Sequence, residues 1–125
     1  MANILIADDS TVMRRSLNLI LTKGGHKVVG QATNGDQAYT LYSQLLPDLV
    51  TMDITMPGTD GIEALQKILK NYPQANIIMI SALDQKKMIL EALESGAKHY
   101  LVKPFKDDKV LATVKEVLSK NTSST

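Results

Sequence analysis

The sequence predicts an α/β fold of the doubly wound class, with helices on both faces of a five-stranded parallel sheet. Short, nearly continuous apolar runs such as residues 3–7, 49–53 and 77–80 are typical of strands that are buried on both faces. Longer stretches with apolar residues at helical spacing alternate with these runs, which is the pattern of consecutive strand–helix units. The 125 residues correspond in size to one domain.

Five strand–helix pairs follow one another along the chain. In order we expect strand 3–7, helix 11–22, strand 27–32, helix 36–45, strand 49–53, helix 61–72, strand 77–80, helix 85–95, strand 99–102 and helix 107–119. The strand over 27–32 is more polar than the others, which favours a place near an edge of the sheet. Right-handed crossovers leave few topologies for such a chain, and we expect the flavodoxin-like strand order 2-1-3-4-5.

Capping and chain-breaking residues support these boundaries. Good N-cap residues precede three of the expected helices: Ser10, Thr59 or Asp60, and Asp84. Glycine and proline end helices or break the chain at Gly24-Gly25, Asn34-Gly35, Pro47-Asp48, Pro73 and Gly96. We assign the domain to residues 1–120 and a polar tail to residues 121–125.

The composition excludes several classes of protein. A net charge of +1 gives no reason to expect nucleic-acid binding, and a chain without cysteine has no disulfide scaffold or thiolate chemistry. The first residues lack the basic region of a signal peptide, and no apolar run approaches the ~20 residues of a membrane span. We therefore expect a cytoplasmic protein that binds neither nucleic acid nor membranes.

Polar side chains stand at the carboxyl ends of four of the expected strands. They are Asp8 with Asp9, Asp53, Ser81 and Lys103. In a parallel sheet these ends share one edge, which is where open α/β folds place their ligands. Turn formation explains one aspartate at a strand end, but it does not explain a complementary set from residues so far apart in the sequence.

The chemistry of this set favours a metal ion and a phosphoryl group. Three neighbouring carboxylates repel one another, and some would be protonated unless a cation lay between them. Oxygen ligands from few residues suit Mg²⁺, which often bridges to phosphate oxygens. Lys103 and Ser81 can contact a phosphoryl oxygen. Because these strand ends carry no histidine or cysteine, the central carboxylate, Asp53, is the candidate nucleophile and would form an acyl phosphate.

With these residues, the sequence resembles the receiver domains of two-component response regulators. The resemblance covers residues 3–119 and rests on four motifs: Asp8-Asp9, Asp53 with Met56-Pro57-Gly58 and Gly61, Ser81-Ala82, and Tyr100 with Lys103-Pro104-Phe105. Within the family the chain is most similar to the single-domain chemotaxis regulators. The resemblance implies a signalling switch and not an enzyme.

The resemblance implies a role for each acidic residue. Asp53 accepts a phosphoryl group from a phosphohistidine on a sensor kinase. Mg²⁺ is held by Asp9, by Asp53 and by the backbone carbonyl of Thr55, and Asp8 acts mainly through a metal-bound water. Lys103 and Ser81 contact the phosphoryl group.

A switch and an output surface are also implied by the resemblance. Tyr100 is the switch aromatic, which turns inward when Ser81 is drawn toward the phosphate, and the Lys103–Pro104 peptide bond is cis. The output face consists of the fourth helix, the fifth strand and the fifth helix. The expected partners are a CheA-like histidine kinase, an output protein such as a flagellar motor switch component, and a separate phosphatase. The protein itself is expected to be a monomer.

Several side chains lie on or near this output face: Lys86, Lys87, Met88, Lys98, His99 and Lys106. They are compatible with two interpretations. The first is an ordinary solvated helix surface that happens to expose a methionine. The second is a docking surface for a short partner segment with acidic and hydrophobic side chains.

Two positions differ from the best-known members of the family. Thr55 lies two residues after Asp53, and Leu83 lies two residues after Ser81. Acidic or amide side chains at these places can orient the water that attacks the acyl phosphate. Threonine and leucine are less suited to this, and Leu83 could shield the phosphate. We therefore expect slower self-dephosphorylation than in fast chemotaxis regulators, and dependence on a phosphatase.

Other functions fit the residues less well. A Mg²⁺-dependent phosphatase with an aspartate nucleophile would carry that nucleophile on its first strand, with a second acid two residues later. A flavodoxin-like flavin protein would need a first loop that receives phosphate, which Asp8-Asp9 would repel. Within the family, the chain is a freestanding chemotaxis regulator, another single-domain relay, or a receiver domain from a longer protein.

Overall fold

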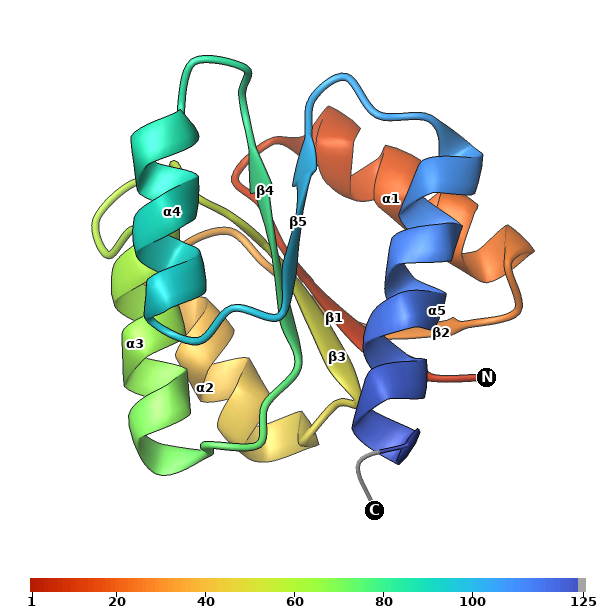
Figure 1. Ribbon diagram of the computed structural model, residues 1–125, viewed down its shortest axis with the longest axis horizontal. Helices are drawn as coiled ribbons and strands as arrows, with labels where there is room; N and C mark the ends of the chain where they lie inside the picture. Colours follow the sequence, from red (N-terminus) through yellow and green to blue (C-terminus); the bar gives the residue numbers. More distant parts are fainter. Residues whose placement is uncertain (124–125) are drawn as a thin grey trace.

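The computed structural model describes the backbone of residues 1–123 and the side chains of residues 1–120, and it confirms the doubly wound α/β fold (Figure 1). Parallel strands form one sheet in the order β2-β1-β3-β4-β5, with the polar strand β2 at an edge. The elements are β1 (Asn3–Ala7), α1 (Thr11–Lys23), β2 (Lys27–Ala32), α2 (Gly35–Leu45), β3 (Leu49–Asp53), α3 (Gly61–Asn71), β4 (Ile77–Ser81), α4 (Lys86–Glu94), β5 (His99–Val102) and α5 (Asp107–Ser123).

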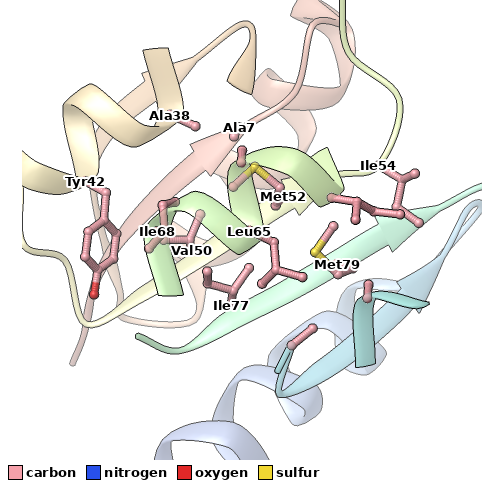
Figure 2. Close-up of a cluster of buried hydrophobic side chains, with 14 of the residues drawn as sticks. Ala7, Ala38, Tyr42, Val50, Met52, Ile54, Leu65, Ile68, Ile77 and Met79 are labelled. Atoms are coloured by element: carbon pink, nitrogen blue, oxygen red, sulfur yellow. The ribbon is translucent and has the colours of Figure 1, made fainter. Parts of the chain in front are cut away.

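Helices cover both faces of the sheet and create two cores. Helices α1 and α5 pack on one face, and α2, α3 and α4 pack on the other (Figure 1). On the second face, alternate residues of β3 and β4 contact α2 and α3, as Figure 2 shows for Val50, Met52, Ile77 and Met79 beside Tyr42, Leu65 and Ile68. The intervening residues Leu49, Ile78 and Ile80 belong to the first core. Burial on both faces explains the continuous apolar runs of these strands.

The chain directly after Asp53 is held tightly against the start of α3. Asp60 caps α3 by accepting a hydrogen bond from the Glu63 N–H at 2.9 Å, and Glu63 accepts in turn from the Asp60 N–H at 3.5 Å. The Gly61 N–H donates to the carbonyl oxygen of Ile54 at 2.8 Å. A Cβ atom on Gly61 would overlap the Asp53 carbonyl oxygen, so this close approach requires glycine.

The start of α4 differs from the expectation. Asp84 is exposed and is not the N-cap, because the helix begins at Lys86 with Gln85 in the N-cap position. Gln85 makes no side-chain capping hydrogen bond. Its side-chain oxygen instead accepts from the Ala82 N–H at 2.7 Å, which closes the turn that leads into the helix.

Helices α1, α2 and α5 are longer than expected, α1 only by Lys23. Helix α2 begins at Gly35, since the Asn34 side chain caps it by accepting from the Gln37 N–H at 2.8 Å. Helix α5 continues to Ser123 because no glycine or proline interrupts it after residue 119. Residues 124–125 of the expected tail lie outside the described residues. None of the helices in the described part of the chain has the length and apolar content to cross a bilayer.

Candidate functional site

The expected site residues meet at one edge of the sheet. Asp53 ends β3 and Ser81 ends β4, while Asp8 directly follows β1 and Lys103 directly follows β5. The backbone N–H of Lys103 donates to the carbonyl oxygen of Ser81 at 2.8 Å, so the β4–β5 ladder continues up to the site. Asp8 and Lys103 are 95 positions apart in the sequence but within side-chain contact here.

An acidic cluster, consisting of Asp8, Asp9 and Asp53, lies on this edge. Each residue offers a carboxylate oxygen, and these atoms all lie within 4.8 Å of one another. Asp8 and Asp53 are buried, whereas Asp9 is exposed. Like charges at such distances repel strongly where water is excluded. The cluster therefore needs neighbouring positive charge.

The loop between β1 and α1 fixes Asp8. Its backbone N–H donates to the Ala32 carbonyl oxygen at 3.0 Å, and its Oδ1 atom accepts from the Ser10 N–H at 2.8 Å. Nη1 of Arg14 donates to the Asp8 carbonyl oxygen at 2.7 Å. The Arg14 contact was not expected from the sequence, because a first-turn arginine is usually solvated and carries no signal for such a bond.

Lys103 supplies positive charge to the acidic cluster. Its Nζ atom lies 3.4 Å from Oδ2 of Asp8 and 3.3 Å from Oδ2 of Asp53, so one ammonium bridges the two buried carboxylates. The peptide bond between Lys103 and Pro104 is cis, the isomer that the resemblance implies. A single ammonium does not balance three carboxylates, and the site retains an excess of negative charge.

Burial and the neighbouring charges change the pKa of Asp53. Burial raises the pKa of the Asp53 carboxyl above its ordinary value, and the nearby charge of Asp8 raises this pKa further. The ammonium of Lys103 and the backbone N–H of Thr55 oppose the shift, without cancelling it. Ionisation of Asp53 is therefore less favourable here than in water.

The acidic cluster fits a hard divalent cation. Its carboxylate oxygens converge from few residues, which is the donor set of Mg²⁺ sites that retain several waters. A dication placed among them would remove the repulsion between Asp8 and Asp53, and it would lower the pKa of Asp53. The residues therefore match the metal that the sequence analysis expects.

Ser81 is buried beside this cluster, and no other group within residues 1–120 makes a hydrogen bond with its hydroxyl oxygen. A buried hydroxyl without a partner is unfavourable. Ser81 also lines a groove of about 280 Å³ between α4 and β5, which we call the switch groove. Tyr100 lines the same groove and is 39% exposed, so its ring has solvent on one side.

The two unusual positions lie on the loops that flank Asp53. Thr55 is exposed, and its hydroxyl oxygen accepts a hydrogen bond from Nε2 of Gln85 at 2.7 Å. Leu83 lines the switch groove and is 79% exposed. Gln85 was missed in the sequence analysis, because a glutamine before a helix gives no indication of a contact with a loop 30 residues earlier.

Comparison with known proteins identifies the family. The response regulator receiver domain family matches residues 4–115, nearly the whole chain. The chain belongs to this family. This receiver domain is therefore a signalling module, and phosphorylation with dependence on Mg²⁺ follows from the family.

Relatives named as chemotaxis proteins resemble this receiver domain closely. CheY of Thermotoga maritima is 47% identical over 114 residues, which cover 91% of this chain and 95% of that protein. CheY of Bacillus subtilis is 49% identical over 116 residues, with 93% and 97% coverage. A chain in the crystal structure of the CheX–CheY–BeF3–Mg²⁺ complex from Borrelia burgdorferi is 39% identical, with a TM-score of 0.88 and coverage of 92% and 87%.

Asp53→Asn tests the electrostatics of the receiver site. At neutral pH without Mg²⁺ the variant should have a higher free energy of unfolding than the wild type, because an amide avoids burying a charge next to Asp8. From about the ordinary pKa of 3.8 up to the raised folded value, folded Asp53 keeps a proton that the unfolded chain has lost. Wild-type stability therefore falls as pH rises through this window.

Urea denaturation at a series of pH values measures the difference between the two proteins. The difference in free energy of unfolding should shrink as pH falls through the raised pKa of Asp53, and it should become constant below the ordinary pKa of an aspartate. Asp84→Asn is the control, because Asp84 is exposed and lies outside the acidic cluster. Parallel pH profiles for the wild type and Asp53→Asn would show that Asp53 is not electrostatically strained.

Proposed function

We propose that this receiver domain accepts a phosphoryl group on Asp53 from a phosphohistidine of a CheA-like kinase, and that it acts as a cytoplasmic, monomeric switch in chemotaxis. The observation that carries the proposal is the buried Asp53 carboxylate, which shares the ammonium of Lys103 with Asp8 at the ligand-binding edge of the sheet. The similarity to CheY proteins supports the chemotaxis role.

In the proposed reaction, a carboxylate oxygen of Asp53 attacks phosphorus while the bond from phosphorus to the histidine nitrogen breaks, leaving an acyl phosphate. The ammonium of Lys103, 3.3 Å from Oδ2 of Asp53, would stabilise the negative charge on the phosphoryl oxygens. Asp9, Asp53 and the Thr55 carbonyl would hold Mg²⁺, with Asp8 acting through a water. The metal supplies positive charge toward the phosphoryl oxygens when it is bound.

Acetyl phosphate with Mg²⁺ tests this assignment. Intact-mass measurement should show one added phosphoryl group on the wild type, and none on Asp53→Asn or when Mg²⁺ is omitted. Asp84→Asn removes an exposed carboxylate outside the acidic cluster and should still gain the adduct. The absence of a Mg²⁺-dependent adduct on the wild type would refute the proposed phosphorylation.

The proposed acyl phosphate is long-lived. Water would have to reach it between the loops that carry Thr55 and Leu83, and neither of these side chains is an acid or an amide. The Thr55 hydroxyl already accepts from Gln85 at 2.7 Å, and the apolar Leu83 side chain lies over the switch groove. A separate phosphatase would then be needed to end the signal.

Leu83→Glu should shorten this lifetime several-fold, because a carboxylate at this position can orient the attacking water. The decay of the phosphorylated mass after removal of acetyl phosphate gives the rate. Leu90→Glu is the matched control, since Leu90 lines the same groove and is also exposed, at 51%. If Leu83→Glu decays no faster than Leu90→Glu, Leu83 does not control the lifetime.

The output face proposed here is formed by α4, β5 and α5. Its lysines, including Lys86, Lys87 and Lys106, are exposed. Met88 is only partly exposed and packs against the core, and His99 makes a 2.8 Å contact with Glu116, so neither is a free docking group. Positive charge beside the apolar switch groove favours an acidic partner segment with hydrophobic side chains, such as one from a flagellar motor switch component.

Phosphorylation would raise the affinity for this partner by shifting a pre-existing equilibrium. Ser81 gains an acceptor when a phosphoryl group is present, and Tyr100 would turn into the space beside it. The solved CheY relative from Borrelia burgdorferi forms a complex with CheX in the presence of BeF3 and Mg²⁺. That complex supports the expectation that the phosphorylated form of this receiver domain binds a second protein.

Binding to the motor switch component of the same organism tests the output face. The beryllofluoride-treated protein should retain more of it in a pull-down than the untreated protein. Lys86→Glu should reduce retention in the treated state, whereas Lys70→Glu, at an exposed position of α3, should not. Equal retention of the motor switch component with and without beryllofluoride would show that phosphorylation does not control this binding.

A further inference from the structure

The side chain of Gln85 joins the two loops that flank Asp53. Its Oε1 atom accepts from the Ala82 N–H at 2.7 Å, and its Nε2 atom donates to Oγ1 of Thr55 at 2.7 Å. Ala82 lies on the loop between β4 and α4, and Thr55 lies on the loop between β3 and α3. We call this pair of hydrogen bonds the Gln85 tether.

Because its side chain forms the tether, Gln85 does not cap the start of α4. Gln85 occupies the N-cap position, yet its side chain does not cap the helix. The first turn has no acidic residue and begins with Lys86 and Lys87, whose charges oppose the positive end of the helix dipole. Two short hydrogen bonds to the loops, with a longer one from Nε2 to Sδ of Met88 at 3.9 Å, therefore define the position of the Gln85 side chain.

Both ends of the tether reach residues that contact the site. The backbone N–H of Thr55 interacts with the carboxylate of Asp53. Ala82 follows Ser81, whose buried hydroxyl has no hydrogen-bond partner in the described part of the chain. The β4–α4 loop is thus fastened in an arrangement that leaves the Ser81 hydroxyl unsatisfied.

We propose that Gln85 is a positioning residue, which holds the β4–α4 loop back from Asp53 by fastening Ala82 to Thr55. This inference rests on the proposed phosphorylation of Asp53. When Asp53 carries a group with acceptor oxygens, movement of the loop toward it gives the Ser81 hydroxyl a partner, and the same movement breaks the tether. Gln85 therefore sets how readily the site closes around its phosphoryl group.

Gln85→Met removes both hydrogen bonds while keeping the length of the side chain, so it should bind beryllofluoride more tightly in the presence of Mg²⁺. The expected gain is about two- to fivefold, the equivalent of one ordinary hydrogen bond. Gln66→Met is the matched control, because Gln66 makes an exposed side-chain contact with Ser95 away from the site. This control should bind beryllofluoride like the wild type.

A double-mutant cycle separates positioning from a general loss of stability. Thr55→Val breaks the tether from its other end, so it should also raise the affinity, and it should add little to Gln85→Met. In NMR spectra of the wild type, the side-chain amide signals of Gln85 should move when beryllofluoride is added. If Gln85 had a purely structural role, both single variants would bind beryllofluoride with the affinity of the wild type.

The outcomes distinguish the two proposals. Wild-type protein that fails to bind beryllofluoride with Mg²⁺ would overturn the proposed function. Wild-type protein that binds it, with Gln85→Met binding equally or more weakly, would overturn the role of Gln85 alone. Thr55→Val provides the same test if Gln85→Met does not fold.

Discussion

The excess of negative charge at the sheet edge is the constraint on which the rest of the structure depends. Parallel strands bring the acidic cluster to one place, and Asp8 and Asp53 are buried there with the ammonium of Lys103 between them. The folded protein tolerates this repulsion because apolar cores on both faces stabilise the sheet. The unfavourable charge is what makes the edge receptive to a dication and to phosphoryl chemistry.

Rigid and adjustable parts of the molecule are separated around Asp53. The capping box of Asp60 and the close approach of Gly61 fix the chain after Asp53 on one side. On the other side, the β4–α4 loop leads to a helix without a side-chain cap and depends on Gln85 for its position. A site in which one loop is fixed by backbone contacts and the other by a single side chain can respond to a new group without disturbing the sheet.

The fold and the candidate site residues were accessible from the sequence because both follow from periodicity. Continuous apolar runs mark the strands, and in a parallel sheet every residue after a strand end lies on the same edge. The start of α4 was not accessible, because Asp84 is the favoured N-cap residue and the hydrogen bonds of the Gln85 side chain, which depend on tertiary structure, override that preference. The bond from Gln85 to Thr55 depends on side-chain conformations in two loops, which leave no repeating pattern.

The unpaired hydroxyl of Ser81 has a consequence for signal strength. A buried hydroxyl without a partner costs about 1–3 kcal/mol, and each 1.4 kcal/mol is about tenfold in an equilibrium. In the proposed switch, the unphosphorylated form would carry this energetic cost, and an acceptor from the phosphoryl group would remove it. The dynamic range between the off and on populations can then be set largely by one small side chain, and it need not require extensive repacking of the core.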